Sequence, residues 1–218
     1  GRDSVTERRP RQGLRALWEA LFVRGPRAVR EEWRLIALSF LALYGLAGIA
    51  WVAVSKDLEL AYSLLQPDVV SNEIDQLEAT ADGNPFRGNV TCGMGESPQT
   101  AACIMLHNMV VGVLFFAAAL LPPLYLLLLS TNALMLGTYT AVAGHWGQAG
   151  AISSILWCHG VLEIQAIVLA GSAGLVLVRA VLLQGIWTRR TSLALSARRG
   201  VDLLLPVFGL LFVAGLIE

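Results

Sequence analysis

A histidine and a carboxylate lie four residues apart in an apolar part of this sequence. These residues are His159 and Glu163, and a helix would place both on one face. The segment from 104 to 178 contains no Lys or Arg, and Glu163 is the only acidic residue within this segment. Because an ionisable side chain inside a bilayer is energetically expensive, this pair is the first candidate for a functional site.

Three interpretations of the pair are open. In a structural role, Glu163 is protonated or paired with His159 and fixes the register of packed helices. In a metal site, His159, Glu163 and Glu218 supply nitrogen and oxygen ligands for zinc or another divalent metal, as in an intramembrane hydrolase. In a transporter, the pair relays protons or binds an ion. We assign no catalytic residue and no cofactor, because the chain has no Walker loop, no GxSxG motif and no catalytic carboxylate pair.

The composition places the pair in a membrane protein. The chain has 218 residues, of which 56% are hydrophobic and 15% charged, and its mean hydropathy is +0.62. These values lie outside the range of soluble domains, so the lipid bilayer is the first expected partner and nucleic acid is not expected as one.

Five apolar segments predict an all-α, polytopic fold with five transmembrane helices. Residues 35 to 55 form the first span, and residues 104 to 218 form a four-span bundle. The spans of this bundle are predicted at residues 104 to 121, 124 to 143, 152 to 178 and 201 to 217. Pro122 and Pro123 predict a tight turn between two of them, because they remove two backbone donors. Asp202 and Pro206 interrupt the last span.

The charged residues predict the orientation. Residues 1 to 34 and residues 179 to 200 are rich in Arg, whereas residues 56 to 103 are mainly acidic. The positive-inside rule places both Arg-rich segments in the cytoplasm and the acidic loop outside, with the N-terminus inside and the C-terminus outside. We expect residues 1 to 34 to contain a basic amphipathic helix, broken at Gly25-Pro26, that lies on anionic headgroups or leads as a solvated helix into the first span.

The loop is expected to contain little regular structure. A short helix is predicted near residues 70 to 80 of the extracytoplasmic loop, and the connector at 179 to 200 is apolar only in patches. Cys92 and Cys103 lie in or beside the loop and could form a disulfide in an oxidising compartment.

The depths of the polar residues permit one buried cluster. At ~1.5 Å rise per residue, Glu163 and Asn132 fall near the middle of the membrane. The predicted cluster consists of His159, Glu163, Asn132, Asn108 and Glu218. The small residues at 171 to 174 fit either packing within the bundle or the seam of a homodimer.

The sequence around the pair resembles a family signature. The run from 159 to 175 is similar to the PHGxxExxAxxxAGxAG signature of the stage II sporulation protein M family. Asn108 resembles the second residue of that family's NN element, residues 132 to 137 resemble its NGxxxG element, and Glu218 resembles its final-helix glutamate. Cys158, His107 and Ala133 depart from these patterns.

This resemblance implies a five-span protein of the bacterial cytoplasmic (inner) membrane. It implies a membrane partner of peptidoglycan-degrading enzymes rather than a catalyst. Our leading hypothesis is therefore a non-enzymatic scaffold or adaptor that positions cell-envelope remodelling proteins, with extracytoplasmic envelope enzymes or other membrane proteins as partners. The metal-dependent hydrolase and the ion-coupled transporter are the alternatives.

Overall fold

The computed structural model describes residues 13–84, 98–150, 153, 160–183 and 188–217. All regular secondary structure in this part of the chain is helical, which confirms the all-α prediction. In chain order the elements are α1 (Gly13–Glu19), the π-helical turn η1 (Ala20–Arg24), α2 (Gly25–Glu31), α3 (Trp33–Lys56), α4 (Glu59–Leu64), α5 (Pro67–Ala81), α6 (Pro98–Ala118), α7 (Pro122–His145), α9 (Val161–Leu182) and α10 (Arg189–Ile217).

Within the described residues, four helices, α3, α7, α9 and α10, are long and apolar enough to cross a membrane. They confirm that the chain is a polytopic membrane protein. The remaining predicted span, residues 104 to 121, corresponds to α6, whose apolar part, Ala102–Ala118, is shorter than the other four helices. At ~1.5 Å per residue it reaches about 25 Å, slightly less than a typical hydrocarbon core. A crossing by α6, and with it the total of five spans, stays a prediction.

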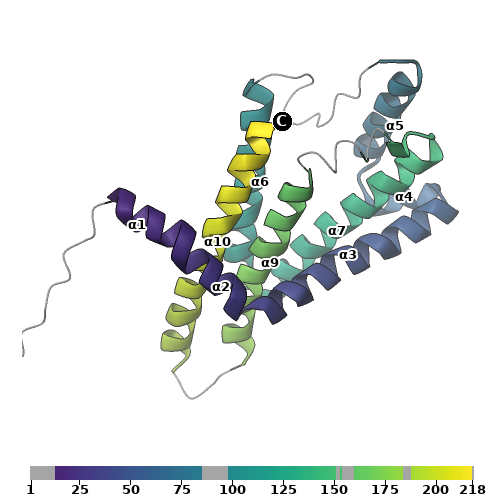
Figure 1. The fold of residues 1–218 in the computed structure, drawn as a ribbon. Helices are drawn as coiled ribbons and strands as arrows, with labels where there is room; N and C mark the ends of the chain where they lie inside the picture. The colour runs from purple at the N-terminus through teal and green to yellow at the C-terminus, as the bar shows by residue number, and fades with distance from the viewer. Residues whose placement is uncertain (1–12, 85–97, 151–152, 154–159, 184–187, 218) are drawn as a thin grey trace, which may run out of the picture.

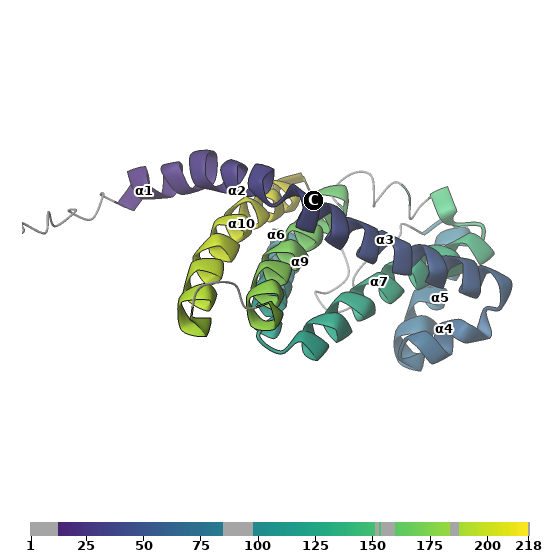
Figure 2. The ribbon, with the colours of Figure 1, turned by 90° about the horizontal axis from the view of Figure 1, so that it is seen from below.

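The long helices form two groups that diverge from a common end. Helices α6, α9 and α10 pack side by side, whereas α3 and α7 run together away from them in both views (Figures 1 and 2). The groups are joined by Tyr125, which is fully buried near the start of α7 and donates a hydrogen bond to the carbonyl oxygen of Gly171 in α9 (2.9 Å). Ser39 of α3 lies at the same point, because a Cβ on Gly171 would be 2.6 Å from its Oγ.

Small residues allow the helices to approach one another closely. A Cβ on Gly174 would lie 2.7 Å from the ring of Tyr125, and one on Gly137 only 2.1 Å from the carbonyl oxygen of Ala47. Residues 171 to 174 are all buried inside the chain. Of the two interpretations of this small-residue face, the structure therefore shows packing within the bundle.

The turn predicted at Pro122-Pro123 is confirmed. Helix α6 ends at Ala118 and α7 begins at Pro122. The prolines occupy the first turn of α7, where a backbone N–H has no partner in the helix, so they begin the helix without loss of an internal hydrogen bond.

The predicted break at Gly25-Pro26 is wrong. The chain stays helical there, and the N–H of Gly25 bonds to the carbonyl of Ala20 across a π-helical turn. This i→i−5 bond belongs to the wider π-turn, and α2 then begins at Gly25 with proline in its first turn. The helix is interrupted instead at Glu32, whose φ of −102° and ψ of 21° lie outside the α-helical region.

The connector contains helix, and the last span is not interrupted as predicted. Helix α9 extends to Leu182 and α10 begins at Arg189, so most of the segment at 179 to 200 is helical. Neither Asp202 nor Pro206 ends α10. Neighbouring contacts accommodate both residues: Asp202 is ion-paired with Arg24, and the ring of Pro206 packs against Gly25.

The acidic segment contains more structure than predicted. The short helix expected near residues 70 to 80 is confirmed as the middle of α5, and α4 precedes it. Together they form a second apolar core with the ends of α3 and α7, composed of Val54, Ala61, Val70, Leu77, Ala141, Val142 and Ala143. The sequence did not predict α4 because its six residues are too short to show a clear hydrophobic period.

Candidate functional site

Two residues of the predicted polar cluster are in contact. Asn108 of α6 donates a hydrogen bond from Nδ2 to Oε1 of Glu163 in the first turn of α9 (2.8 Å). Both side chains are half-buried among apolar residues. An amide donor stabilises a carboxylate oxygen in such a setting without adding a second charge, so this contact compensates part of the cost of burying Glu163.

The other predicted residues are not seen to join this contact. Asn132 donates from Nδ2 to the carbonyl oxygen of Leu128 in its own helix (2.8 Å), a local bond that satisfies the amide within α7. His159 and Glu218 lie outside the described residues. In the part of the chain that is described, no three His, Cys, Asp or Glu side chains come together as metal ligands. The metal site of His159, Glu163 and Glu218 and the complete cluster stay predictions.

The predicted disulfide is resolved in part. Cys103, near the start of α6, is disulfide-bonded. Cys92 lies outside the described residues, so the pairing of these two cysteines stays a prediction.

A second polar contact holds the same region of α9 from another direction. Gln165 donates from Nε2 to the hydroxyl of Tyr44 in α3 (3.3 Å). Residues two apart on a helix point in nearly opposite directions, so Glu163 and Gln165 bind different neighbours. The sequence analysis did not predict this contact, because hydropathy does not show how helices are rotated about their axes. Tyr44 and Gln165 are nevertheless both polar groups in apolar spans.

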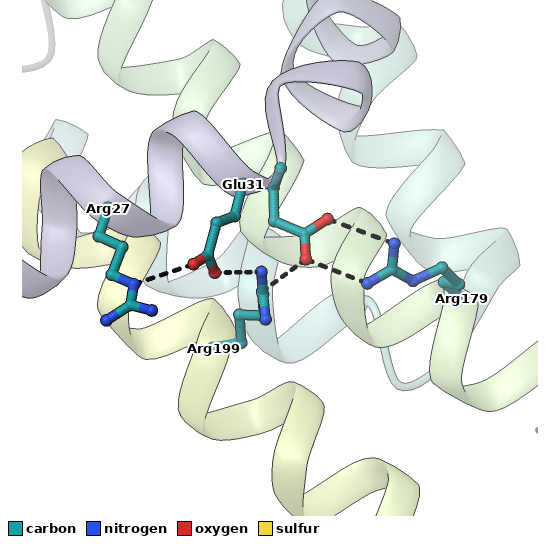
Figure 3. Close-up of polar contacts among 5 residues, drawn as sticks. Arg27, Glu31, Arg179 and Arg199 are labelled. Carbon is teal, nitrogen blue, oxygen red and sulfur yellow. Dashed lines mark hydrogen bonds and ion pairs between the residues drawn. The ribbon is translucent and has the colours of Figure 1, made fainter.

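A network of charges lies at the end of the bundle where α2, α9 and α10 meet (Figure 3). Glu32 is its buried centre, with a side chain only 7% exposed. Arg179 of α9 donates to both carboxylate oxygens of Glu32, at 3.3 Å and 3.2 Å. Arg199 of α10 brings Nε within 2.6 Å of Glu32 Oε1 as an ion pair. This carboxylate thus joins the N-terminal helix to two of the spanning helices.

The neighbouring Glu31 extends the network towards solvent. It accepts a hydrogen bond from Nε of Arg27 (2.9 Å) and another from Arg199. The hydrogen bond from Arg27, assisted by the charge of Arg199, lowers the pKa of Glu31 below its usual value. Arg24 and Asp202 add a further ion pair at 3.1 Å.

The sequence analysis missed this network but contained a signal for it. Glu31, Glu32 and Asp202 are acids within segments otherwise dominated by Arg, and the positive-inside rule places both segments at the same membrane face. Acids among arginines on one face are candidates for ion pairs between segments.

At their C-terminal ends, away from the charge network, α3 and α7 contact each other and the acidic helix α5. Trp146 donates from Nε1 to Oε1 of Glu78 (3.2 Å), and His145 Nε2 lies 3.3 Å from the carbonyl oxygen of Val54. Glu73 of α5 is mostly buried, and this burial raises its pKa to about 7. The acidic helices are therefore fixed to the ends of the spans, and the carboxyl group of Glu73 keeps its proton to a higher pH than an exposed glutamate does.

Comparison with known proteins identifies the family of this chain. The family model described as Stage II sporulation protein M matches residues 36–218. Neither a curated protein nor a solved structure matches the chain significantly. The matched region includes Asn108, Glu163, Arg179 and Arg199, whereas Glu31 and Glu32 precede it.

Proposed function

The chain belongs to the stage II sporulation protein M family, and we propose that it is an integral membrane scaffold that recruits or positions cell-envelope remodelling proteins, among them enzymes that act on peptidoglycan. The proposed location is the bacterial inner membrane, with the N-terminus in the cytoplasm. The proposed docking surface is the exposed acidic face of α4 and α5.

The observation that carries this proposal is the way in which the acidic helices are anchored. Val70 and Leu77 of α5 and Ala61 of α4 are buried against the ends of α3 and α7. A flexible acidic loop would lose conformational entropy on binding, but a surface held by its own apolar core is ordered before a partner arrives. This arrangement suits a docking platform.

The charge of this platform predicts the kind of partner. Between residues 57 and 84 the chain has no Lys or Arg. The exposed acids on this surface are Asp57, Glu59, Asp68, Asp75, Glu78 and Asp82. A partner with a basic surface would be attracted and oriented by this field. We therefore expect the recruited proteins to dock through Lys- and Arg-rich faces.

The positions of the charged groups support the proposed orientation. The Arg-containing network lies near the start of α3, whereas α4 and α5 follow its end at Lys56. A helix of this length separates the two charge clusters by about the thickness of a membrane. With arginines favoured in the cytoplasm, the acidic platform faces the outside, where envelope enzymes act.

Capture from native membranes tests the proposal. The full chain, tagged and cross-linked in bacterial cells, should recover extracytoplasmic envelope proteins. Replacement of Asp68→Lys together with Asp75→Lys, seven residues apart on the exposed face of α5, should strongly reduce this recovery.

A matched control changes the charge at the other end of the molecule. Arg190→Gln with Arg198→Gln alters two exposed residues of α10 and should leave recovery unchanged. Recovery of no envelope protein, or equal recovery by the Asp68 and Asp75 variant, would refute the scaffold proposal.

A further inference from the structure

The helical segment before the first span is covered on one side only. Within segment α1–η1–α2, η1 and α2 pack against α10, whereas α1 extends away from it (Figures 1 and 2), and the buried residues of the segment include Ala20, Gly25 and Ala28. Two large aromatic side chains lie on an uncovered side. Trp18 is 61% exposed and Phe22 is 65% exposed, with ring centroids 5.5 Å apart. An exposed aromatic pair of this size is unfavourable in water and favourable at a membrane interface.

The contacts with α10 establish which side of this segment faces the apolar span. Along α10, Arg199 binds Glu31, Asp202 binds Arg24, and Pro206 packs against Gly25. These three residues of α10 follow one another from its Arg-rich start into its apolar part, which has no charge from 203 to 217. Glu31 and Arg24 therefore lie on the side of the segment that faces the Arg-rich end.

The aromatic pair lies on the other side of the segment. Phe22 precedes Arg24 by two residues, and side chains two apart in a helix point in nearly opposite directions. The π-helical turn η1 includes one additional residue per turn, which keeps Trp18, Phe22 and the exposed Pro26 along one line. This apolar line is therefore turned away from the charge network.

Exposed arginines accompany the aromatic residues. Arg15 is one turn before Trp18, and Arg30 is one turn after Pro26. At the start of α3, the guanidinium of Arg34 lies 5.6 Å from the ring centroid of the exposed Trp33. Aromatic rings beside arginines at the end of a span are typical of the headgroup region, where the cations contact lipid phosphates.

From this arrangement we propose that α1 and η1 lie in the membrane interface and bind anionic phospholipids. Trp18 and Phe22 insert among the upper acyl chains, and Arg15, Arg30 and Arg34 contact the headgroups. The segment precedes the region that the family model matches. The inference is independent of the scaffold proposal, because it concerns the lipid and not an envelope protein.

Photo-cross-linking in the full chain tests this inference. Benzoylphenylalanine replaces Phe22, and the control replaces Arg27, an exposed residue on the charged side of the segment. After irradiation in bacterial membranes, mass spectrometry should find phospholipid adducts at position 22 and at least tenfold fewer at position 27. An adduct with a protein at position 22, or equal lipid adducts at both positions, would overturn the proposal.

The charge dependence is tested in nanodiscs of phosphatidylcholine and phosphatidylglycerol in equal amounts. The adducts at position 22 should be enriched in phosphatidylglycerol. Arg15→Gln with Arg30→Gln should reduce this enrichment by about fivefold per arginine, since each basic residue near an anionic surface contributes about 1 kcal/mol. Arg190→Gln with Arg198→Gln should leave it unchanged. Enrichment that survives loss of Arg15 and Arg30, or no enrichment in the original chain, would overturn the proposed headgroup contacts.

Discussion

Nε of Arg199 lies 2.6 Å from Oε1 of Glu32, a carboxylate whose side chain is only 7% exposed. The two residues are far apart in the sequence: Glu32 lies at the interruption between α2 and α3, and Arg199 lies in α10, which contains the last predicted span. Because Arg179 binds the same carboxylate, Glu32 fixes the N-terminal segment to α9 and α10 simultaneously. The contact thus connects the N-terminal helical segment with the long apolar helices α9 and α10.

Loss of this carboxylate should destabilise the fold. Glu32→Ala leaves Arg179 and Arg199 without their shared partner, and we expect a loss of about 2 kcal/mol, between the values for exposed and fully buried ion pairs. For a chain of this size, that corresponds to a fall in Tm of about 4–8 °C in detergent. Arg198→Ala, an exposed neighbour on α10, should change Tm by much less. Equal melting of both variants would show that the network contributes nothing to stability.

The crossing of α3 and α7 should tolerate no side chain at Gly137. Its Cβ would lie 2.1 Å from the backbone oxygen of Ala47, which cannot rotate away. Gly137→Ala should therefore separate the two helices and cost about 1–3 kcal/mol. Gly48→Ala is the matched control, since it adds a methyl group to α3 with nothing within 4 Å, and it should be neutral or stabilise by up to about 1 kcal/mol. Unfolding in detergent measures both, and a neutral Gly137→Ala would contradict this account of the crossing.

The sequence predicted the elements better than it predicted their contacts. Uncharged runs are visible in the sequence because the bilayer demands them, so the spans that contain α3, α7, α9 and α10 were found with approximate boundaries. The turn at Pro122-Pro123 was found because proline acts locally. Pro26 was misjudged because its effect depends on the π-helical turn before it and on the packing of Gly25 against Pro206.

The candidate site was predictable to the same limited degree. The depth of a residue in the membrane follows from its position along the helix, so Asn108 and Glu163 could be placed at depths that permit a contact between them. Rotation about the helix axis does not follow from residue number, and Asn132 bonds instead within its own helix. The contact between Tyr44 and Gln165 was missed for the same reason.

Glu73 should make stability depend on pH. Burial raises its pKa from 4.5 to about 7, so the folded state holds a proton that the unfolded state releases between these values. The associated stability is present below pH 4.5 and is lost as the pH rises towards 7, at up to about 1.4 kcal/mol per pH unit. Glu73→Gln should therefore melt at a higher temperature than the original chain at pH 8, and at a similar temperature at pH 4.5.

The control for this pH effect is Asp75→Asn, an exposed position on the same helix. Its effect on Tm should be small and similar at both pH values. If Glu73→Gln shows no greater benefit at pH 8 than at pH 4.5, the carboxyl group of Glu73 does not hold a proton in the folded state.

The hydrogen bond between Asn108 and Glu163 should appear as energetic coupling. A double-mutant cycle of Asn108→Ala and Glu163→Ala should give a coupling of about 1 kcal/mol, because polar contacts between membrane helices are seldom stronger than this. Unfolding of the four proteins in detergent provides the measurement. Additivity within about 0.5 kcal/mol would indicate that the two residues do not act together.

Glu163→Gln distinguishes the scaffold from its rivals. The glutamine retains an oxygen that can accept from Nδ2 of Asn108 but carries no charge and releases no proton. A scaffold needs only the packing of α6 against α9, so this variant should remain folded and recover the same envelope proteins. A transporter would lose ion or proton flux in liposomes, and a metal enzyme would lose bound zinc on elemental analysis. These tests require that the original chain shows measurable flux or binds stoichiometric metal. Loss of either property in Glu163→Gln would show that Glu163 has a chemical role, which would contradict the scaffold proposal.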